Sequence, residues 1–290
     1  ASSGRVGLYV LNAMTGAEIK FIELPAGYAH GIGLGGVTVV RNAARQIVAA
    51  YAGDAGGNLW RFKLSGPVSD WGVSNNKPLF TSPTAQAIYA APAWQVHPGA
   101  PGHACQATGS APGACGTIVV VGTGILLDDD HLSNTNMQSF YGIWDNIPIG
   151  GTDVPYKDSS YTMVQQSIDL ASAAAGLGTG SGNTYYTVSK NTLDWTKNKG
   201  WYLNMSALPN TTGERVIGDL FNLGSSVFAT SVVISNTVTT EDSCIASSGA
   251  VNVMYGIDAL TGGLKKSYDQ NGDGKADAFS VVYLPKGGFT

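Results

Sequence analysis

The stretch MYGIDALTG (residues 254–262), late in the chain, closely matches LYVLNAMTG (residues 8–16) near its beginning. Each opens with residues that alternate between the two faces of a β-strand, and each ends with Asn or Asp followed by a Thr-Gly turn. Two further segments, NLWRFKLSG (58–66) and SFYGIWDN (139–146), share the aromatic-bearing opening. The sequence therefore repeats one strand-and-turn unit along its whole length.

A strand rich in Val, Ile and Ala precedes three of these units, as QIVAAYAGD (46–54), TIVVVGTG (117–124) and SVFATSVV (226–233). Antiparallel hairpins that recur at irregular intervals, with Gly-, Ser- and Thr-rich insertions between them, are typical of a β-propeller. A β-sandwich is the competing all-β fold, but it does not explain the similarity of the units. We predict one all-β propeller domain over residues 1–290, with about four to five blades. Its Trp and Tyr side chains are expected to fill the spaces between blades.

The first residues already lie within a repeat, at the position of an outer strand of a blade. Because unpaired strand edges promote aggregation, such a blade needs partner strands. They could come from the C-terminus of this chain or from sequence outside it. We favour an incomplete part of a larger propeller, whose remaining blades belong to the parent protein. One helix is expected, over residues 165–178 (QQSIDLASAAAGLG), with Gly where the helix would end.

Composition narrows the class of protein. The 290 residues are 43% hydrophobic, which is enough for a sizeable core, and 12% charged, with a net charge of -4. The lack of a basic excess argues against nucleic acid as a partner. No apolar run approaches the roughly 18 residues that a membrane-spanning helix needs. A surface rich in Ser, Thr, Asn and Gly is typical of secreted bacterial β-proteins.

The three cysteines point to an oxidising compartment. Cys105 and Cys115 bracket a loop rich in Gly, Ser and Pro, and we predict a disulfide between them. Unrelated thiols or a metal pair are the alternatives, but the loop between them contains no His or further Cys. Cys244 is then left over, either free or bonded to sequence outside this chain.

An acidic stretch near the end of the chain, DQNGDGKAD (269–277), has the spacing of a calcium-binding loop. Gly274 stands at the sixth position, where such a loop turns sharply, but position 12 is Ser280 and not the bidentate Glu of an EF-hand. A simple hairpin turn is the alternative, although three carboxylates in one turn would repel each other. The predicted Ca²⁺ ligands are the side chains of Asp269, Asn271, Asp273 and Asp277 and the carbonyl of Lys275.

A second acidic cluster, Asp128, Asp129 and Asp130, is followed by His131. It could be a solvated loop, which we favour, a second cation site, or a carboxylate–histidine pair for hydrolysis. The sequence contains neither a G-x-S-x-G nor an H-E-x-x-H motif, so we do not predict an enzyme.

Several segments together resemble the later part of the C-terminal propeller of the PilC/PilY family of type IV pilus proteins. They run in the family's order across almost the whole chain: YAGDAGGNLWRF (51–62), PLFTS with AIYAAPAW (78–94), VVVGTGILLDDDH with QSFYGIWD (119–145), GWYLNM (200–205), GERVIGD (213–219) and Cys244 with MYGIDALTG (244–262). Members often carry an acidic, calcium-loop-like run just before the YAGD strand. Here Arg41 and Arg45 occupy that place, so the resemblance does not extend to a cation site there.

The resemblance implies a secreted or surface-exposed bacterial protein that acts at the pilus in assembly, retraction control or adhesion. It also implies calcium in or near residues 269–277. Minor pilins and a host or surface receptor would be the partners. The alternative function is a secreted glycan-binding or hydrolytic propeller that uses the loop from Asp128 to His131.

Overall fold

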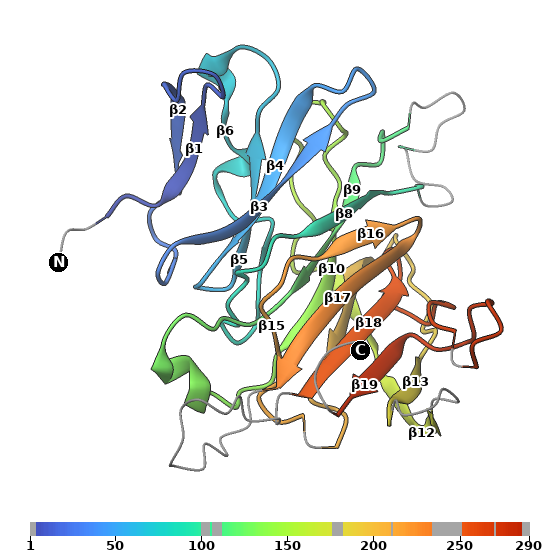
Figure 1. The fold of residues 1–290 in the computed structure, drawn as a ribbon. Coiled ribbons are helices and arrows are strands. Elements are labelled where there is room, and N and C mark those ends of the chain that lie inside the picture. Colours follow the sequence, from blue (N-terminus) through green and yellow to red (C-terminus); the bar gives the residue numbers. More distant parts are fainter. Residues whose placement is uncertain are drawn as a thin grey trace.

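The computed structural model describes residues 4–99, 105, 112–175, 182–209, 211–233, 251–269 and 271–285. These residues form four β-sheets, and the chain is coloured from blue at its N-terminus to red at its C-terminus in Figure 1. The first sheet pairs β1 (Gly7–Leu11) with β2 (Glu18–Glu23). The second has the order β3-β4-β5-β6, with β7 beside β5, and its strands are β3 (Leu34–Arg41), β4 (Ile47–Asp54), β5 (Asn58–Lys63), β6 (Gly72–Val73) and β7 (Phe80–Thr81).

The third and fourth sheets interleave in sequence. The third has the order β11-β14-β10-β9-β8, and its strands are β8 (Ala93–Val96), β9 (Thr117–Gly122), β10 (Ser139–Asp145), β11 (Thr162–Gln166) and β14 (Asn198–Asn204). The fourth has the order β12-β13-β19-β18-β17-β15, with β16 beside β17, and its strands are β12 (Ile168–Ala175), β13 (Thr184–Val188), β15 (Arg215–Val216), β16 (Phe221–Leu223), β17 (Ser226–Val233), β18 (Val251–Asp258) and β19 (Val281–Leu284). The predicted hairpins β4–β5, β9–β10 and β17–β18 are all antiparallel pairs, which confirms the repeat.

The repeated turn has the same local structure at both ends of the chain. Asn12 accepts hydrogen bonds from the backbone N–H groups of Met14 and Thr15 through its side chain. Asp258 accepts them in the same way from Leu260 and Thr261. Each turn ends in a glycine with positive φ, the conformation that glycine adopts without a steric cost.

Strand β9 shows how the sheets pack together. Ile118 and Val120 lie in the hydrophobic cluster shared with the fourth sheet, whereas Val119 and Val121 lie in the cluster shared with the second. All four are at most 1% exposed. Because both faces of the strand are covered, its sequence is a continuous apolar run instead of an alternating one.

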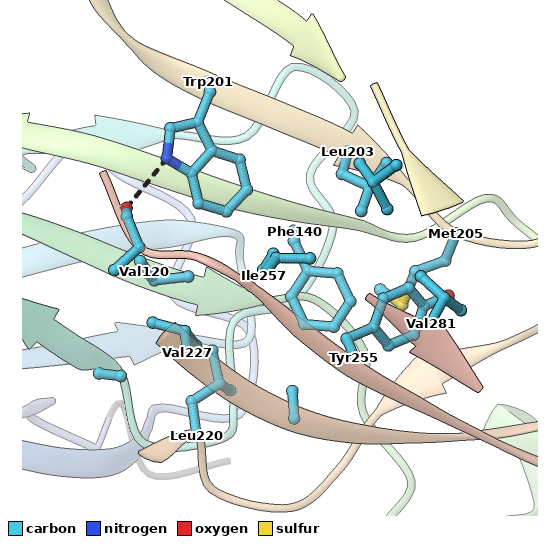
Figure 2. Close-up of a cluster of buried hydrophobic side chains, with 14 of the residues drawn as sticks. Val120, Phe140, Trp201, Leu203, Met205, Leu220, Val227, Tyr255, Ile257 and Val281 are labelled. Carbon is cyan, nitrogen blue, oxygen red and sulfur yellow. Dashed lines mark hydrogen bonds between the residues drawn. The ribbon is translucent and has the colours of Figure 1, made fainter. Parts of the chain in front are cut away.

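Aromatic side chains fill the spaces between sheets, as predicted. Trp201 is fully buried in the cluster between the third and fourth sheets, where its indole nitrogen donates a hydrogen bond to the Ala259 carbonyl at 3.1 Å (dashed line in Figure 2). Phe140 and Tyr255 meet in the same cluster with ring centroids 4.7 Å apart. Trp60 has the corresponding role between the first and second sheets.

Glycine in the repeated Tyr-Gly-Ile sequence makes room for an aromatic ring on the paired strand. Gly142 lies directly opposite Trp201, and a Cβ atom on it would be 2.2 Å from the indole. Gly256 lies opposite Phe228, and a Cβ atom there would be 2.8 Å from the ring. The two hairpins thus use the same cross-strand arrangement of glycine and aromatic ring.

The predicted helix over residues 165–178 is wrong. Up to residue 175 this segment forms the end of β11 and all of β12, and residues 176–178 lie outside the described part of the chain. Gln166 is fully buried and donates from its side chain to the carbonyls of Asn191 and Thr261. Tertiary hydrogen bonds and pairing with β13 therefore outweigh the helix propensity of the alanines.

The predicted disulfide is present. Cys105 and Cys115 are bonded, with their Cα atoms 5.1 Å apart. Cys244 lies outside the described residues. Among the described helices, none has the length and apolar character that crossing a membrane would need.

Candidate functional site

Tyr268 and Asp277 close a loop that lies between β18 and β19 of the fourth sheet. The Asp277 N–H donates to the Tyr268 carbonyl at 2.7 Å, and an isolated antiparallel bridge joins the same two residues. Gly272 and Gly274 both have positive φ, of 78° and 83°, so the chain reverses at the positions where the sequence has glycine.

Side-chain oxygens hold this loop in a series of tight turns. Asp269 accepts from the N–H groups of Gly272 at 2.7 Å and Gly274 at 2.8 Å. Asn271 accepts from the Asp273 N–H at 2.9 Å, and Asp273 from the Lys275 N–H at 2.8 Å. Hydrogen bonds from the backbone, the one from Gly274 foremost, lower the pKa of the Asp269 carboxyl. The Asp269 side chain is therefore ionised over the whole physiological pH range.

The five predicted ligands are suited to Ca²⁺ by their chemistry. An ionised carboxylate has about four lone-pair sites, so Asp269, which accepts a third bond from the Asn271 N–H, retains about one for a cation. Asn271 and Asp273 each retain free acceptor sites by the same count, and both are exposed. Within the described residues, however, no group of three or more His, Cys, Asp or Glu side chains is close enough to hold a metal. The carboxylates of Asp269, Asp273 and Asp277 are thus in one loop but are not gathered around one point.

Two residues beside the loop have structural roles. Ser280, at position 12 of the loop pattern, is fully buried and exchanges hydrogen bonds with the backbone of Lys265 at 2.7 Å in both directions. Tyr268 packs edge-on against Phe228 with ring centroids 6.2 Å apart, and burial raises the pKa of its hydroxyl. These contacts attach the ends of the loop to the fourth sheet.

The second acidic cluster forms the start of a short 3₁₀ helix, η4 (Asp129–Ser133). The Asp128 carboxylate accepts from the His131 N–H at 3.2 Å and contacts His131 Nδ1 at 2.7 Å, as an N-terminal cap does. Arg215 of β15 stabilises this segment, because its guanidinium donates to the carbonyls of Ile125, His131 and Asn134. The contacts between Asp128 and His131 thus stabilise a connecting loop, the interpretation that the sequence favoured.

A buried ion pair between the second and third sheets was not predicted. Arg61 of β5 lies 2.7 Å from Asp145 of β10, and their side chains are 3% and 1% exposed. The Tyr51 hydroxyl donates a hydrogen bond to the same carboxylate at 2.5 Å, and the Arg61 guanidinium donates one to the Ser74 hydroxyl at 2.6 Å. Burial raises the pKa of the Asp145 carboxyl, against the opposing effect of Arg61. A charged residue at a buried position of each apolar strand, Arg61 in NLWRFK and Asp145 in SFYGIWD, is the signal that could have indicated it.

Comparison with known proteins identifies the family. Residues 2–181 match the PilY1 beta-propeller domain. The chain belongs to this PilY1 β-propeller family. The resemblance noted in the sequence is therefore confirmed, as is the all-β propeller fold.

Individual relatives agree with the PilY1 assignment. The chain is 29% identical over 291 aligned residues to the type IV pilus biogenesis factor PilY1 of Pseudomonas aeruginosa, and the match covers 89% of this chain and 23% of that protein. It is 27% identical to a PilY1 homolog of Xylella fastidiosa, of which it covers 17%. The crystal structure of the Pseudomonas aeruginosa PilY1 C-terminal domain superposes with a TM-score of 0.76 at 27% identity, over 98% of this chain and 62% of that one. The chain thus spans about a quarter or less of the curated relatives it matches.

Proposed function

We propose that this chain is the propeller module of a type IV pilus biogenesis factor and acts at the bacterial surface, in pilus assembly, retraction control and adhesion. Membership of the PilY1 family carries this proposal, because the relatives from two genera are named as pilus biogenesis factors. Minor pilins and a surface receptor are the proposed partners. The module would serve as a binding scaffold without a reaction of its own.

Deletion of this region from the encoding gene tests the pilus role. An in-frame deletion that leaves the rest of the parent protein intact should reduce the number of pili sheared from the cell surface and the diameter of twitching zones. Expression of the intact gene in trans should restore both. Unchanged pilus yield and unchanged twitching, with the shortened protein still detected at the surface, would contradict the proposal.

We further propose that residues 269–277 bind one Ca²⁺ ion. The oxygen spacing at positions 1, 3, 5, 7 and 9, the turns at Gly272 and Gly274, and the unused acceptor sites of Asp269, Asn271 and Asp273 support this proposal. A bound cation would offset the repulsion between the carboxylates and draw them together. The loop residues would then present one ordered surface beside the fourth sheet. The contact of Tyr268 with Phe228 attaches the beginning of the loop to that sheet.

Calorimetric titration and thermal melts, with calcium and with chelator, test the metal proposal. At a calcium concentration 100 times the dissociation constant, the folded state should gain about 2.7 kcal/mol. Asp273→Ala should remove both the heat of binding and the gain in stability. Lys275→Gln is the matched control: it changes an exposed side chain of the loop but keeps the carbonyl ligand, so it should bind as the wild type does.

Magnesium gives a further contrast. It requires six short bonds in near-octahedral geometry, so it should bind this flexible loop more weakly than calcium. No calorimetric signal at millimolar calcium, together with identical melts in calcium and in chelator, would leave the loop as a hydrogen-bonded turn. Failure of this test would not bear on the pilus role, which is supported by family membership.

A further inference from the structure

A cavity of about 810 Å³ opens between the second and third sheets. Its walls come from the β4–β5 turn, from the segment after β7, from the β9–β10 connection and from β14. The cavity therefore lies beside the β9–β10 connection, where these segments of the second and third sheets meet. Volumes of this order accommodate small ligands and not long extended segments.

Aromatic rings form one wall of the cavity. Phe80 and Tyr141 have ring centroids 4.8 Å apart, and Tyr141 and Tyr202 have centroids 6.3 Å apart. The Tyr141 hydroxyl donates to Gln86 Oε1 at 2.6 Å, and Gln86 Nε2 donates to the Met137 carbonyl at 2.7 Å. These bonds fix the wall before any ligand enters, so a ligand meets a rigid aromatic surface.

Amide side chains lie beside the aromatic wall, because Asn204 follows Tyr202 by two residues on β14 and pairs with Ser139 of β10. Asn204 accepts from the Ser139 hydroxyl at 2.9 Å, and its NH₂ group donates no hydrogen bond to another described residue. Gln138 is 8% exposed, and its side-chain oxygen receives no hydrogen bond from the described residues. A buried acceptor without a donor is uncommon in folded proteins, and it is often explained by a missing water or ligand. The Gln138 oxygen is itself inaccessible from the cavity, whereas Asn204 is half-buried in the lining, so its NH₂ group can donate to a ligand.

The charge of the cavity restricts the ligand. Its lining contains no Asp, Glu or Lys among the described residues. Arg215 belongs to the lining, but its guanidinium already donates to backbone carbonyls, including that of Gly213 at 3.0 Å. His131 is held by Asp128. The lining thus offers no carboxylate to a cation, and most N–H groups of Arg215 are used within the protein, although its positive charge remains.

We propose that this cavity binds one or two neutral sugar rings, as a recognition site and without a reaction. A sugar ring has an apolar C–H face that packs on aromatic rings and a rim of hydroxyl groups that bind amides, and this cavity provides both surfaces. Tyr202 would contact the apolar face, and Asn204 would donate to a hydroxyl oxygen. This proposal does not depend on calcium or on the pilus role.

Titration of the purified chain with free sugars tests the site. Saturation-transfer NMR and calorimetry would use galactose, glucose, mannose and N-acetylglucosamine, with N-acetylneuraminic acid as a charged comparison. At least one neutral sugar should bind with a Kd on the order of 1 mM, and the acid should bind more weakly. Tyr202→Ala and Asn204→Ala should each weaken binding by about tenfold or more, while keeping the wild-type melting temperature within a few degrees.

The control is Phe221→Ala, which removes an aromatic ring that is 59% exposed on the fourth sheet, outside the cavity, and should bind as the wild type does. Equal affinity of folded Tyr202→Ala and Asn204→Ala for the sugar would overturn the assignment of the site. No binding of any of the four neutral sugars, or binding of an uncharged Gly-Ser peptide in their place, would overturn the proposal itself.

Discussion

Replacement of Arg61 by Met should lower the free energy of unfolding more than any surface substitution does. Arg61 forms the buried ion pair with Asp145 between the second and third sheets. The Arg61 and Asp145 side chains are 3% and 1% exposed, so water cannot replace the lost partner. Removing one member of a buried pair typically costs about 3 to 5 kcal/mol, since the remaining charge is left uncompensated. We expect this loss of unfolding free energy at pH 7.

The dependence on pH separates the charge effect from a loss of packing. Burial already raises the pKa of Asp145, and loss of Arg61 would raise it further. A raised folded-state pKa means that stability is fully present below the unfolded pKa of about 3.9 and is lost as pH rises through the folded value. The destabilisation by Arg61→Met should therefore be largest at neutral pH and should shrink as pH falls towards about 4.

Urea denaturation followed by tryptophan fluorescence measures this difference. Arg5→Met is the matched control, because Arg5 pairs with Glu23 at 2.7 Å on the surface, where the side chains are 66% and 47% exposed. Solvent screens such an exposed pair, so Arg5→Met should change the free energy of unfolding much less than Arg61→Met does. The reasoning is refuted if Arg61→Met costs no more than Arg5→Met, or if its cost is the same at pH 4 and pH 7.

Three further changes test other parts of the fold. Cys115→Ser should cost about 3 kcal/mol by releasing a closed loop, and intact mass with and without reductant should differ by two hydrogens in the wild type alone. Gly142→Ala should lower the free energy of unfolding, measured with urea, by about 1 to 3 kcal/mol, because the new Cβ atom would overlap Trp201. Gly218→Ala is the control and should be nearly neutral, because no atom lies within 4 Å of its Cβ position. Equal effects would contradict this reasoning. Burial raises the pKa of the Glu214 carboxyl, so the stability that its protonated form contributes is lost as pH rises above the unfolded value of about 4.3. Glu214→Gln should therefore flatten the dependence of unfolding free energy on pH between pH 4 and 7. An unchanged slope would count against this.

The parts of this protein that were predicted well are local. The alternation in MYGIDALTG and its Asp258 turn predict one arm of a hairpin, and the structure has that arm as β18. The Cys105–Cys115 pair could be predicted because the two residues close a short loop. Segment 165–175 was predicted as a helix but forms strands. An alanine-rich sequence favours a helix locally, and here pairing with a strand from elsewhere in the chain outweighs that preference.

The number of blades and the completeness of the ring remain predictions, as does calcium at residues 269–277. The sequence predicted the oxygen spacing of that loop, and the structure adds its turns and its attachment through Tyr268. The structure also shows that, within the described residues, the carboxylates of Asp269, Asp273 and Asp277 do not converge on one point. The spacing of ligands along a chain specifies which atoms are available, whereas their convergence depends on the fold and on the cation.

By itself, the sequence determined the hairpins, their turns and the class of fold, because strand alternation and turn chemistry depend on residues that are close along the chain. Tertiary structure decided the rest. It placed β13 beside β19, so that Tyr186 pairs with Val281, and it brought Arg61 to Asp145 and Gln86 to Tyr141. Such contacts arise where one sheet packs on the next. This packing depends on all the side chains between the sheets, so it cannot be predicted from any short stretch of sequence.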